Sequence, residues 1–409
     1  MGVKSAHLIE AVAHNPDGGT VHLSPIEASV TMDESWAPFI QGSLTCWAAD
    51  AETLALLDPR LDTRVTLTLK QSFGVIQTVA QFNAEWAGKT IADFNTAWAG
   101  KTFKDFNRAH TSAWNLTGFR APSEITLDVT MRSRAVDHAA GTVTFEVASD
   151  EALLQDFALV SDTTEGTGGT SVLTAVNYAL AKIGATVTGT TDATVEAESL
   201  VWAPGVSADR YLTPPLQAAN LRLHCDEARV WRLGTPVFDT PGSIRLSELQ
   251  SVTRAEQTIS RDAEWYDAVV IRYLWTDEFN IAVTAYDTAT TPGYTKVLTL
   301  EYDKPYPGPG AAQGILDRAA GRGRVFDVEA TSDYSVYPGK DLILTLPDTP
   351  VQSGVVSAVT WTFPADRMTV TSRGLTDTPP TAWVAAPEGY TWADSPAGTS
   401  WLDYTPPPV

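Results

Sequence analysis

Apolar and polar residues alternate most clearly in the segment 261–373, where the apolar positions are largely β-branched or aromatic. Such residues suit a pleated, half-buried surface better than a helix. We therefore predict strands, separated by glycine-containing turns, at 264–273, 341–346, 355–363 and 367–371. One helix, 311–320, is expected after the first of these strands and ends at Gly321. We interpret the whole segment as an antiparallel meander.

The first part of the chain carries the same alternation, interrupted by turn residues. Strands are predicted at 26–32, 41–47, 63–69, 124–129 and 141–150. Residues 54–60 are expected to form a short helical or turn segment that stops at Pro59. The polar block 132–138 is interpreted as a surface loop between the last two strands.

Helical periodicity replaces strand periodicity after residue 148. Helices are predicted at 149–160, 171–183 and 208–220. The last of them is expected to be broken at Pro214 and Pro215, because proline removes a backbone donor inside a helix. Residues 221–233 then predict a β-hairpin that turns at Asp226 and Glu227. This part of the chain is thus expected to form a smaller α+β domain.

The order of these elements resembles that of the tail hub (baseplate hub) proteins of long-tailed bacteriophages. The resemblance rests on a strand with Trp-Tyr-Asp-Ala-Val-Val-Ile-Arg-Tyr, a helix, strands introduced by Tyr-Pro-Gly-Lys-Asp and containing Gly-Val-Val-Ser-Ala-Val-Thr-Trp, and a final Asp-Arg-Met-Thr-Val. The hairpin at 221–233 and the Asp-Pro-Arg motif at 58–60 are similar as well. None of these motifs is a catalytic signature. The resemblance leaves out the repeat that starts at Phe82 and the C-terminal end of the chain.

The resemblance implies a mainly β fold with an α+β middle domain. With 409 residues the chain exceeds what a single core supports, and two to four domains are expected. Two tube-like antiparallel β-barrel or β-sandwich domains would occupy 1–148, with an inserted aromatic repeat at 71–120, and 245–373. The α+β domain would occupy 149–244, and a Trp- and Pro-rich extension would follow at 374–409.

By the same resemblance, the chain would be a structural protein without enzymatic activity or cofactor. It would form a homotrimer at the tail tip of the virion after synthesis in the host cytoplasm. Apart from the resemblance, no apolar run approaches the length of a membrane span, so no membrane anchor is expected. The trimer would join the ring of the six-fold tail tube or distal tail protein to tip, fibre or receptor-binding proteins. Tape measure protein and DNA would pass through its lumen without specific binding.

Charge agrees with a surface that does not hold nucleic acid. The formal net charge is −21, from 28 basic and 49 acidic residues, whereas phosphate binding requires clustered Lys and Arg. After Arg373 the chain has no basic residue at all. An acidic lumen would keep the phosphates of passing DNA from binding to its wall.

Two repeats supply candidate partner-binding residues. Residues 82–93 recur as 94–105, which predicts short helices that each carry a tryptophan, Trp86 and Trp98, on an appendage that faces a partner. The alternative is a local duplication that packs on its own domain. At the C-terminus, Trp383, Trp392 and Trp401 recur every nine residues among prolines. They would dock a neighbouring protein, unless this end of the chain is a disordered tail.

Other chemistry has little support in the sequence. The six histidines lack metal-ligand spacing, and Cys46 and Cys225 are expected to be free thiols rather than a disulfide. The N-terminal residues 1–15 lack the apolar region of a signal peptide. The chief alternative function is a carbohydrate-binding or glycoside-active acidic β-protein, because tryptophan faces stack on sugars and a carboxylate pair is compatible with glycoside hydrolysis. A related injection device is a third possibility.

Overall fold

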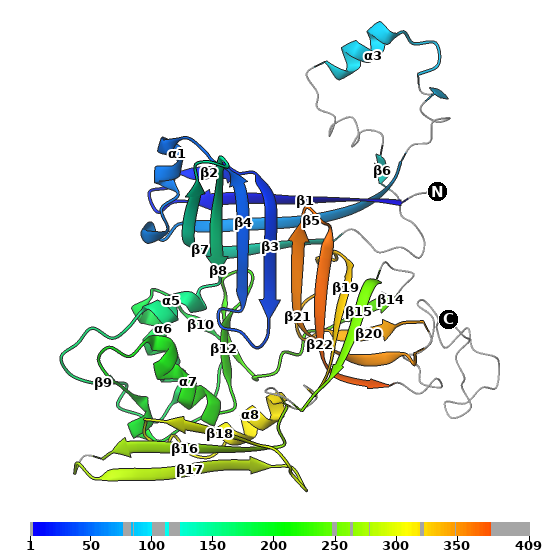
Figure 1. The fold of residues 1–409 in the computed structure, drawn as a ribbon. Helices are drawn as coiled ribbons and strands as arrows, with labels where there is room; N and C mark the ends of the chain where they lie inside the picture. Colours follow the sequence, from blue (N-terminus) through cyan, green and yellow to red (C-terminus); the bar gives the residue numbers. More distant parts are fainter. Residues whose placement is uncertain are drawn as a thin grey trace.

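The structure is a computed structural model, and it describes residues 3–76, 83–84, 86–99, 111–113, 123–247, 252–261, 265–277, 279–319, 323–347 and 349–377. Two β units form the upper part of the molecule in Figure 1, and a helical unit and a small sheet lie below them. None of the described helices is both long and apolar enough to cross a membrane.

The first β unit comprises seven long or medium strands and two short helical segments. These are β1 (Val3–His14), β2 (Thr20–Leu23), β3 (Pro25–Asp33), β4 (Ile40–Trp47), α1 (Ala51–Leu56), η1 (Pro59–Leu61), β5 (Arg64–Ile76), β7 (Ser123–Asp137) and β8 (Thr142–Ala148). The short β6 (Thr111–Ala113) pairs with the end of β5. Alternation decides which side is buried: Val65, Leu67 and Leu69 of β5 point into the core and are at most 1% exposed.

The second β unit is built from β14 (Ser243–Ser247), β15 (Val252–Ile259), β19 (Arg324–Thr331), β20 (Asp341–Thr345), β21 (Gln352–Phe363) and β22 (Arg367–Asp377). Its strands belong to the same 14-stranded sheet as those of the first unit, because β21 pairs with β3. The two units also share one hydrophobic core cluster, which contains Phe145 and Leu67 from the first and Val370 and Trp361 from the second.

Both units follow one plan. In the first, the strands pair in the order β1-β5-β7-β8-β4-β3, and in the second in the order β14-β20-β21-β22-β19-β15. Strands at the same position in the two orders also come at the same place along the chain. Thus β1, β3, β4, β5, β7 and β8 correspond to β14, β15, β19, β20, β21 and β22. Only the first pair differs in direction, since β1 is antiparallel to β5 whereas β14 is parallel to β20.

The middle of the chain has its own core. It contains α5 (Glu151–Asp156), β9 (Glu165–Gly166), α6 (Val172–Lys182), β10 (Val187–Thr188), η2 (Ala197–Leu200), β11 (Val201–Trp202), α7 (Ala208–Ala218), β12 (Arg222–Cys225) and β13 (Trp231–Gly234). Trp202 is fully buried at the centre and stacks on Tyr211 with ring centroids 4.8 Å apart. The predicted hairpin at 221–233 is confirmed as β12 and β13.

Helix α7 is continuous, so the predicted break at Pro214 and Pro215 is wrong. Pro214 has no N–H to donate to the Arg210 carbonyl one turn earlier. The ammonium group of Lys304 donates to that carbonyl instead. Both prolines are buried, and the packed face of the helix therefore compensates for the missing backbone bonds.

The strand predicted at 264–273 forms, but not in the expected meander. It is β16 (Ala268–Thr276), the central strand of a separate three-stranded sheet with β17 (Ala282–Thr290) and β18 (Val297–Tyr302), and α8 (Ala311–Ala319) packs on this sheet. The strand is paired on both sides, which explains why its sequence is an apolar run typical of a central strand. The sequence does not indicate, however, which sheet contains the strand.

The block 132–138 is also different from the prediction. Residues up to Asp137 continue β7 and pair with β8, and a bulge lies between Met131 and Ser133. The bulge inserts one residue and so interrupts the alternation of apolar and polar side chains. Since the strand beyond it is only partly covered, its sequence is polar and resembles a loop.

Candidate functional site

The two β units are joined by a regular antiparallel pairing of β21 with β3. Six pairs run without interruption from Ala358 opposite Asp33 to Phe363 opposite Ala28. On the inner side, Trp361 lies opposite Val30 and both are at most 2% exposed. On the outer side, the hydroxyls of Thr360 and Thr31 form a hydrogen bond of 2.8 Å.

The outer side of the joined sheet is polar across the seam. The strand registers place Thr331, Arg367, Thr362, Ser29, Ser43, Glu146 and Ser133 in one row that crosses seven strands. Two rows follow on one side of it: the first contains Glu329, Thr369, Thr360, Thr31 and Gln41, and the second contains Asp327, Thr371, Ala358 and Asp33. Two rows follow on the other side: the first contains Glu27, Thr45, Thr144 and Ala135, and the second contains Trp47, Thr142 and Asp137. We call this surface the threonine face.

The inner rows are apolar in the same registers. One contains Ala330, Met368, Trp361, Val30, Gly42, Val147 and Met131, and another Val328, Val370, Val359, Met32 and Ile40. The joined sheet is thus one two-sided layer, with a core on one side and the threonine face on the other.

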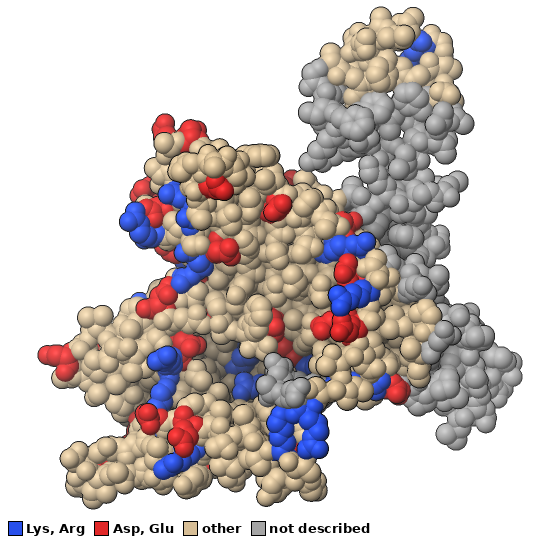
Figure 2. Space-filling view, in the orientation of Figure 1, with Lys and Arg blue, Asp and Glu red and all other residues tan. Residues whose placement is uncertain are grey.

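Acidic groups outnumber basic ones on the threonine face. With β15 included, its rows carry the carboxylates of Glu27, Asp33, Asp137, Glu146, Glu256, Asp327 and Glu329, and the guanidinium groups of Arg254 and Arg367. Several carboxylates are held by hydroxyls, as in the bonds from Ser43 to Glu146 (2.9 Å) and from Thr371 to Asp327 (2.7 Å). Figure 2 shows mostly uncharged atoms over β3, β4 and β8, with isolated acidic side chains among them.

A second contact between the β units lies at His7. Its Nδ1 is hydrogen-bonded to the Tyr334 hydroxyl and lies 3.8 Å from a carboxylate oxygen of Asp366. The Ser123 hydroxyl accepts a hydrogen bond of 3.0 Å from the Tyr334 N–H. Burial lowers the pKa of the His7 imidazole, and the Asp366 carboxylate opposes this shift. Neutral His7 is therefore part of the contact at neutral pH.

The middle unit is fastened to the first β unit by buried charges. Asp150 accepts from Arg64 at 2.6 Å and from Arg229 at 2.9 Å, and the Thr130 hydroxyl donates to it at 2.7 Å. The side chain of Asp150 is 6% exposed. The Tyr337 hydroxyl of the second β unit donates to Glu227 at 2.8 Å, so the turn of the β12–β13 hairpin contacts both units.

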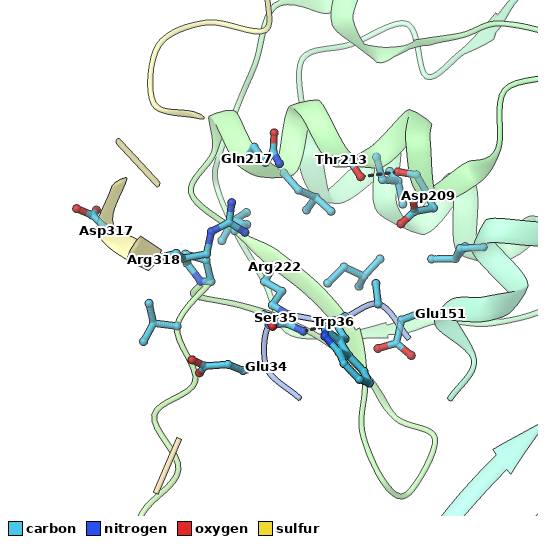
Figure 3. A pocket seen from close by; sticks show the side chains of 18 of the residues that line it. Glu34, Ser35, Trp36, Glu151, Asp209, Thr213, Gln217, Arg222, Asp317 and Arg318 are labelled. Carbon is cyan, nitrogen blue, oxygen red and sulfur yellow. Dashed lines mark hydrogen bonds between the residues drawn. The ribbon is translucent and has the colours of Figure 1, made fainter. Parts of the chain in front are cut away.

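A cavity of about 540 Å³ opens between the β3–β4 connection, α7 and α8. Figure 3 shows Glu34, Trp36, Arg222 and Arg318 around it, with Glu151 below α7. Glu34 is ion-paired with Arg373, and the Trp36 carbonyl accepts from Arg222 at 3.1 Å. The cavity therefore lies where the two joined β units, the middle unit and the helix α8 of the three-stranded sheet meet.

Two opposite charges beside this cavity are strongly desolvated. Burial lowers the pKa of Arg222 to about 10, and the carboxylates of Glu151 and Glu34 oppose this. Burial raises the pKa of Glu151, while the Cys225 N–H, which donates to it at 2.9 Å, favours its ionised form. Each of the two side chains is hydrogen-bonded to backbone, Arg222 to the Trp36 carbonyl and Glu151 to the Cys225 N–H.

Of the predicted partner-binding residues, the structure describes Trp86 and Trp98. Trp86 contacts Phe94 edge to face at 5.0 Å, Lys89 lies over the Trp86 ring, and Phe94 is 6.5 Å from Trp98. Phe94 and Trp98 belong to α3 (Ile91–Trp98), which starts with a capping box formed by Thr90 and Asp93. The two tryptophans thus share one aromatic cluster. Trp383, Trp392 and Trp401 lie outside the described residues.

Sequence reasoning missed the threonine face. Its signal was present, because Thr, Ser or acidic residues occupy every second position in 27–33 and 142–146, and Arg367, Thr369 and Thr371 alternate with apolar residues in 367–371. The predicted free thiols are confirmed: Cys46 and Cys225 are buried and unpaired with each other, and burial raises the pKa of Cys46 to about 11. Within the described part of the chain, no three His, Cys, Asp or Glu side chains are grouped as metal ligands.

The fold is that of phage tail proteins. The structure is similar to the tail protein from Neisseria meningitidis MC58, with a TM-score of 0.51 and 9% identity over 89% of this chain and 96% of that one. It is also similar to a 43 kDa prophage MuSo2 tail protein from Shewanella oneidensis (TM-score 0.48, 10% identity, 89% and 98% covered) and to a prophage tail protein from Listeria monocytogenes EGD-e (0.49, 7%, 90% and 95%). No family model and no curated protein sequence matches the chain. The mainly β fold class and the resemblance to phage tail proteins are thus confirmed.

Proposed function

We propose that this chain is the trimeric hub of a phage tail tip, in which each copy supplies two neighbouring positions of a six-membered ring. The observation that carries this proposal is the pairing of β21 with β3, which joins two β units of one plan edge to edge. A contact between two like units is a repeatable, head-to-tail contact, and such contacts generate rings when the rotation closes.

The threonine face is proposed as the wall of the central channel. Its hydroxyls are satisfied by neighbouring side chains, as in the pairs Thr31 with Thr360 and Thr45 with Thr144 (3.2 Å). Its excess of carboxylates repels phosphates, whereas DNA binding depends on clustered cations. DNA and tape measure protein would therefore pass along it without binding.

The remaining parts would contact other tail proteins. The aromatic cluster of Trp86 and Trp98 and the tryptophans at 383, 392 and 401 are proposed to dock the tail-tube ring, tip, fibre or receptor-binding proteins, because large aromatic area binds at little entropic cost. The virion tail tip would be the final location, after assembly in the host cytoplasm.

Mass measurement in solution and electron microscopy test the ring. The expected result is a particle with three times the mass of the chain and an open axis lined by β-strands. A monomer that binds glycans would contradict the proposal and favour the alternative of a carbohydrate-binding or glycoside-active protein.

The channel wall is tested by charge reversal. Replacing Glu146, Asp137 and Glu329 by Lys should create salt-dependent binding of double-stranded DNA to the trimer, with a slope of log K against log salt steeper by about 0.9 for each phosphate contacted. Fluorescence anisotropy of labelled DNA measures this. A control with Glu52, Asp162 and Glu198, which are exposed and outside the rows of the threonine face, replaced by Lys should bind more weakly. Equal binding by the two variants would contradict the assignment of the channel.

A further inference from the structure

The two β units correspond residue by residue around their hairpins. The hairpin β7–β8 closes with Asp137 opposite Thr142, and the hairpin β21–β22 closes with Thr362 opposite Arg367. Each has a register shift at the same distance from the turn, between Met131 and Ser133 in the first and between Val356 and Ala358 in the second. Residues 133–137 of β7 therefore correspond to residues 358–362 of β21.

The outer hairpin strands correspond equally closely. The register of β3 with β4 shifts between Pro25 and Glu27, and the register of β15 with β19 shifts between Val252 and Arg254. After the shift, both pairings are regular to the end, at Met32 opposite Ile40 and at Ile259 opposite Arg324. Residues 27–32 of β3 therefore correspond to residues 254–259 of β15.

This correspondence leaves one seam unfilled. Within the chain, β3 covers residues 358–363 of β21. On β7, however, β5 pairs only with residues 123–130, and among the described residues no strand lies beside 133–137 on that side. The strand that corresponds to β3 is β15, and no described strand pairs with its outer edge. Figure 1 shows β7 and β15 on opposite sides of the joined sheet.

We propose that β15 of one copy pairs antiparallel with the second half of β7 of the next copy, in the register that β3 adopts on β21. This proposal rests on the proposed function and specifies how its ring closes. The predicted pairs are Arg134 with Ile259, Ala135 with Thr258, Val136 with Gln257 and Asp137 with Glu256. Each copy would contribute eight strands to one continuous closed layer, four from each β unit. Their order would be β15, β19, β22 and β21 of the second unit, followed by β3, β4, β8 and β7 of the first.

The side chains at both edges fit this partner. Ile259 is 74% exposed, although its counterpart Met32 is fully buried in the seam within the chain. Pairing would cover Ile259 with Arg134 and place it near Val136. Asp137 and Glu256 would face each other, but Arg254, which already binds Glu256, would lie diagonally opposite Asp137 and offset the repulsion.

Paired cysteines test the register directly. Cα atoms of paired residues in antiparallel strands are about 4.5 or 5.5 Å apart, within the range that a disulfide spans. The double variant Ala135→Cys, Thr258→Cys should therefore form a covalent trimer on oxidation with diamide, visible by non-reducing electrophoresis. The native thiols are buried and should not interfere.

The matched control is Ala135→Cys, Glu256→Cys, in which the cysteines are diagonal neighbours about 7–8 Å apart and should cross-link far less. A trimer in which both variants cross-link equally or neither does would overturn the register and leave the proposed hub intact. A protein that remains monomeric at all concentrations would overturn both.

A second variant works without cross-linking. Ile259→Lys places a cation against Arg134 and should shift the monomer–trimer equilibrium at least tenfold towards monomer, measured by analytical ultracentrifugation. The melting temperature of the monomer should not change, because Ile259 is exposed there. Ile281→Lys is the matched control, since Ile281 is 59% exposed, directly precedes β17 of the three-stranded sheet and belongs to neither β7 nor β15. An unchanged equilibrium for Ile259→Lys would contradict the proposal.

Discussion

The seam within the chain and the two open edges have the same strand plan but different side chains. The seam buries Val359 and Trp361 of β21 against Met32 and Val30 of β3. The corresponding open positions are Arg134 and Val136 on β7 and Ile259 and Gln257 on β15. A permanent seam can be as apolar as a core, whereas an edge that is exposed before assembly must resist indiscriminate pairing, and charged or polar residues provide that resistance.

The largest loss of stability is expected for a substitution of Trp361 in the seam. Trp361→Ala removes a buried ring from the seam and its hydrogen bond to the Asp333 carbonyl (3.1 Å), and it should lower the free energy of unfolding by about 3–5 kcal/mol. The corresponding change at the open edge, Val136→Ala, should cost about 1 kcal/mol or less, because Val136 is only partly buried. Urea unfolding of both variants under monomeric conditions measures the difference. If both variants lost the same free energy of unfolding, the side chains of the seam would contribute no more to stability than those of the open edges, which would contradict the comparison.

The next prediction concerns a feature that only the first unit has. Asp150 corresponds in the hairpin to Leu375, so the second unit lacks the ion pairs with Arg64 and Arg229. Asp150→Asn should cost about 2–3 kcal/mol, less than a fully buried pair because the side chain of Arg229 is 37% exposed. Thermal unfolding should detect it. Asp58→Asn, which breaks the exposed pair with Arg60, is the control and should change little.

The smallest effect is the dependence of the contact at His7 on pH. Since the pKa of His7 is lowered in the folded protein, the unfolded chain binds more protons, and stability should fall as the pH decreases through 6.5 and below. Urea unfolding between pH 7.5 and pH 5 measures this slope. His7→Gln should flatten it, while His138→Gln, on the exposed β7–β8 turn, should not. An identical slope in the His7 variant would contradict the role of this residue.

Much of the fold could be predicted because local patterns decide it. The alternation of Val65, Leu67 and Leu69 in β5, the helix predicted at 171–183 and the hairpin predicted at 221–233 each depend on neighbouring residues, and all three form as expected. Residues 132–137 could not be assigned, since a bulge and a half-open edge remove the alternation that identifies a strand. The threonine face was missed for a different reason. Single strands such as β3 show the alternation, but the rows are assembled from strands far apart in the sequence, such as β3 with β21, and no local pattern indicates which strands pair.

Covalent connection of the two β units has a consequence for assembly. The ends of β3 and β21 are held on one polypeptide, so their meeting is a unimolecular event whose rate does not depend on how much protein the cell has made. Half of the seams in a ring would then be complete as soon as each chain has folded. Only the other half would respond to dilution, so the expression level would control the number of complete rings and not the integrity of the two joined units in each chain.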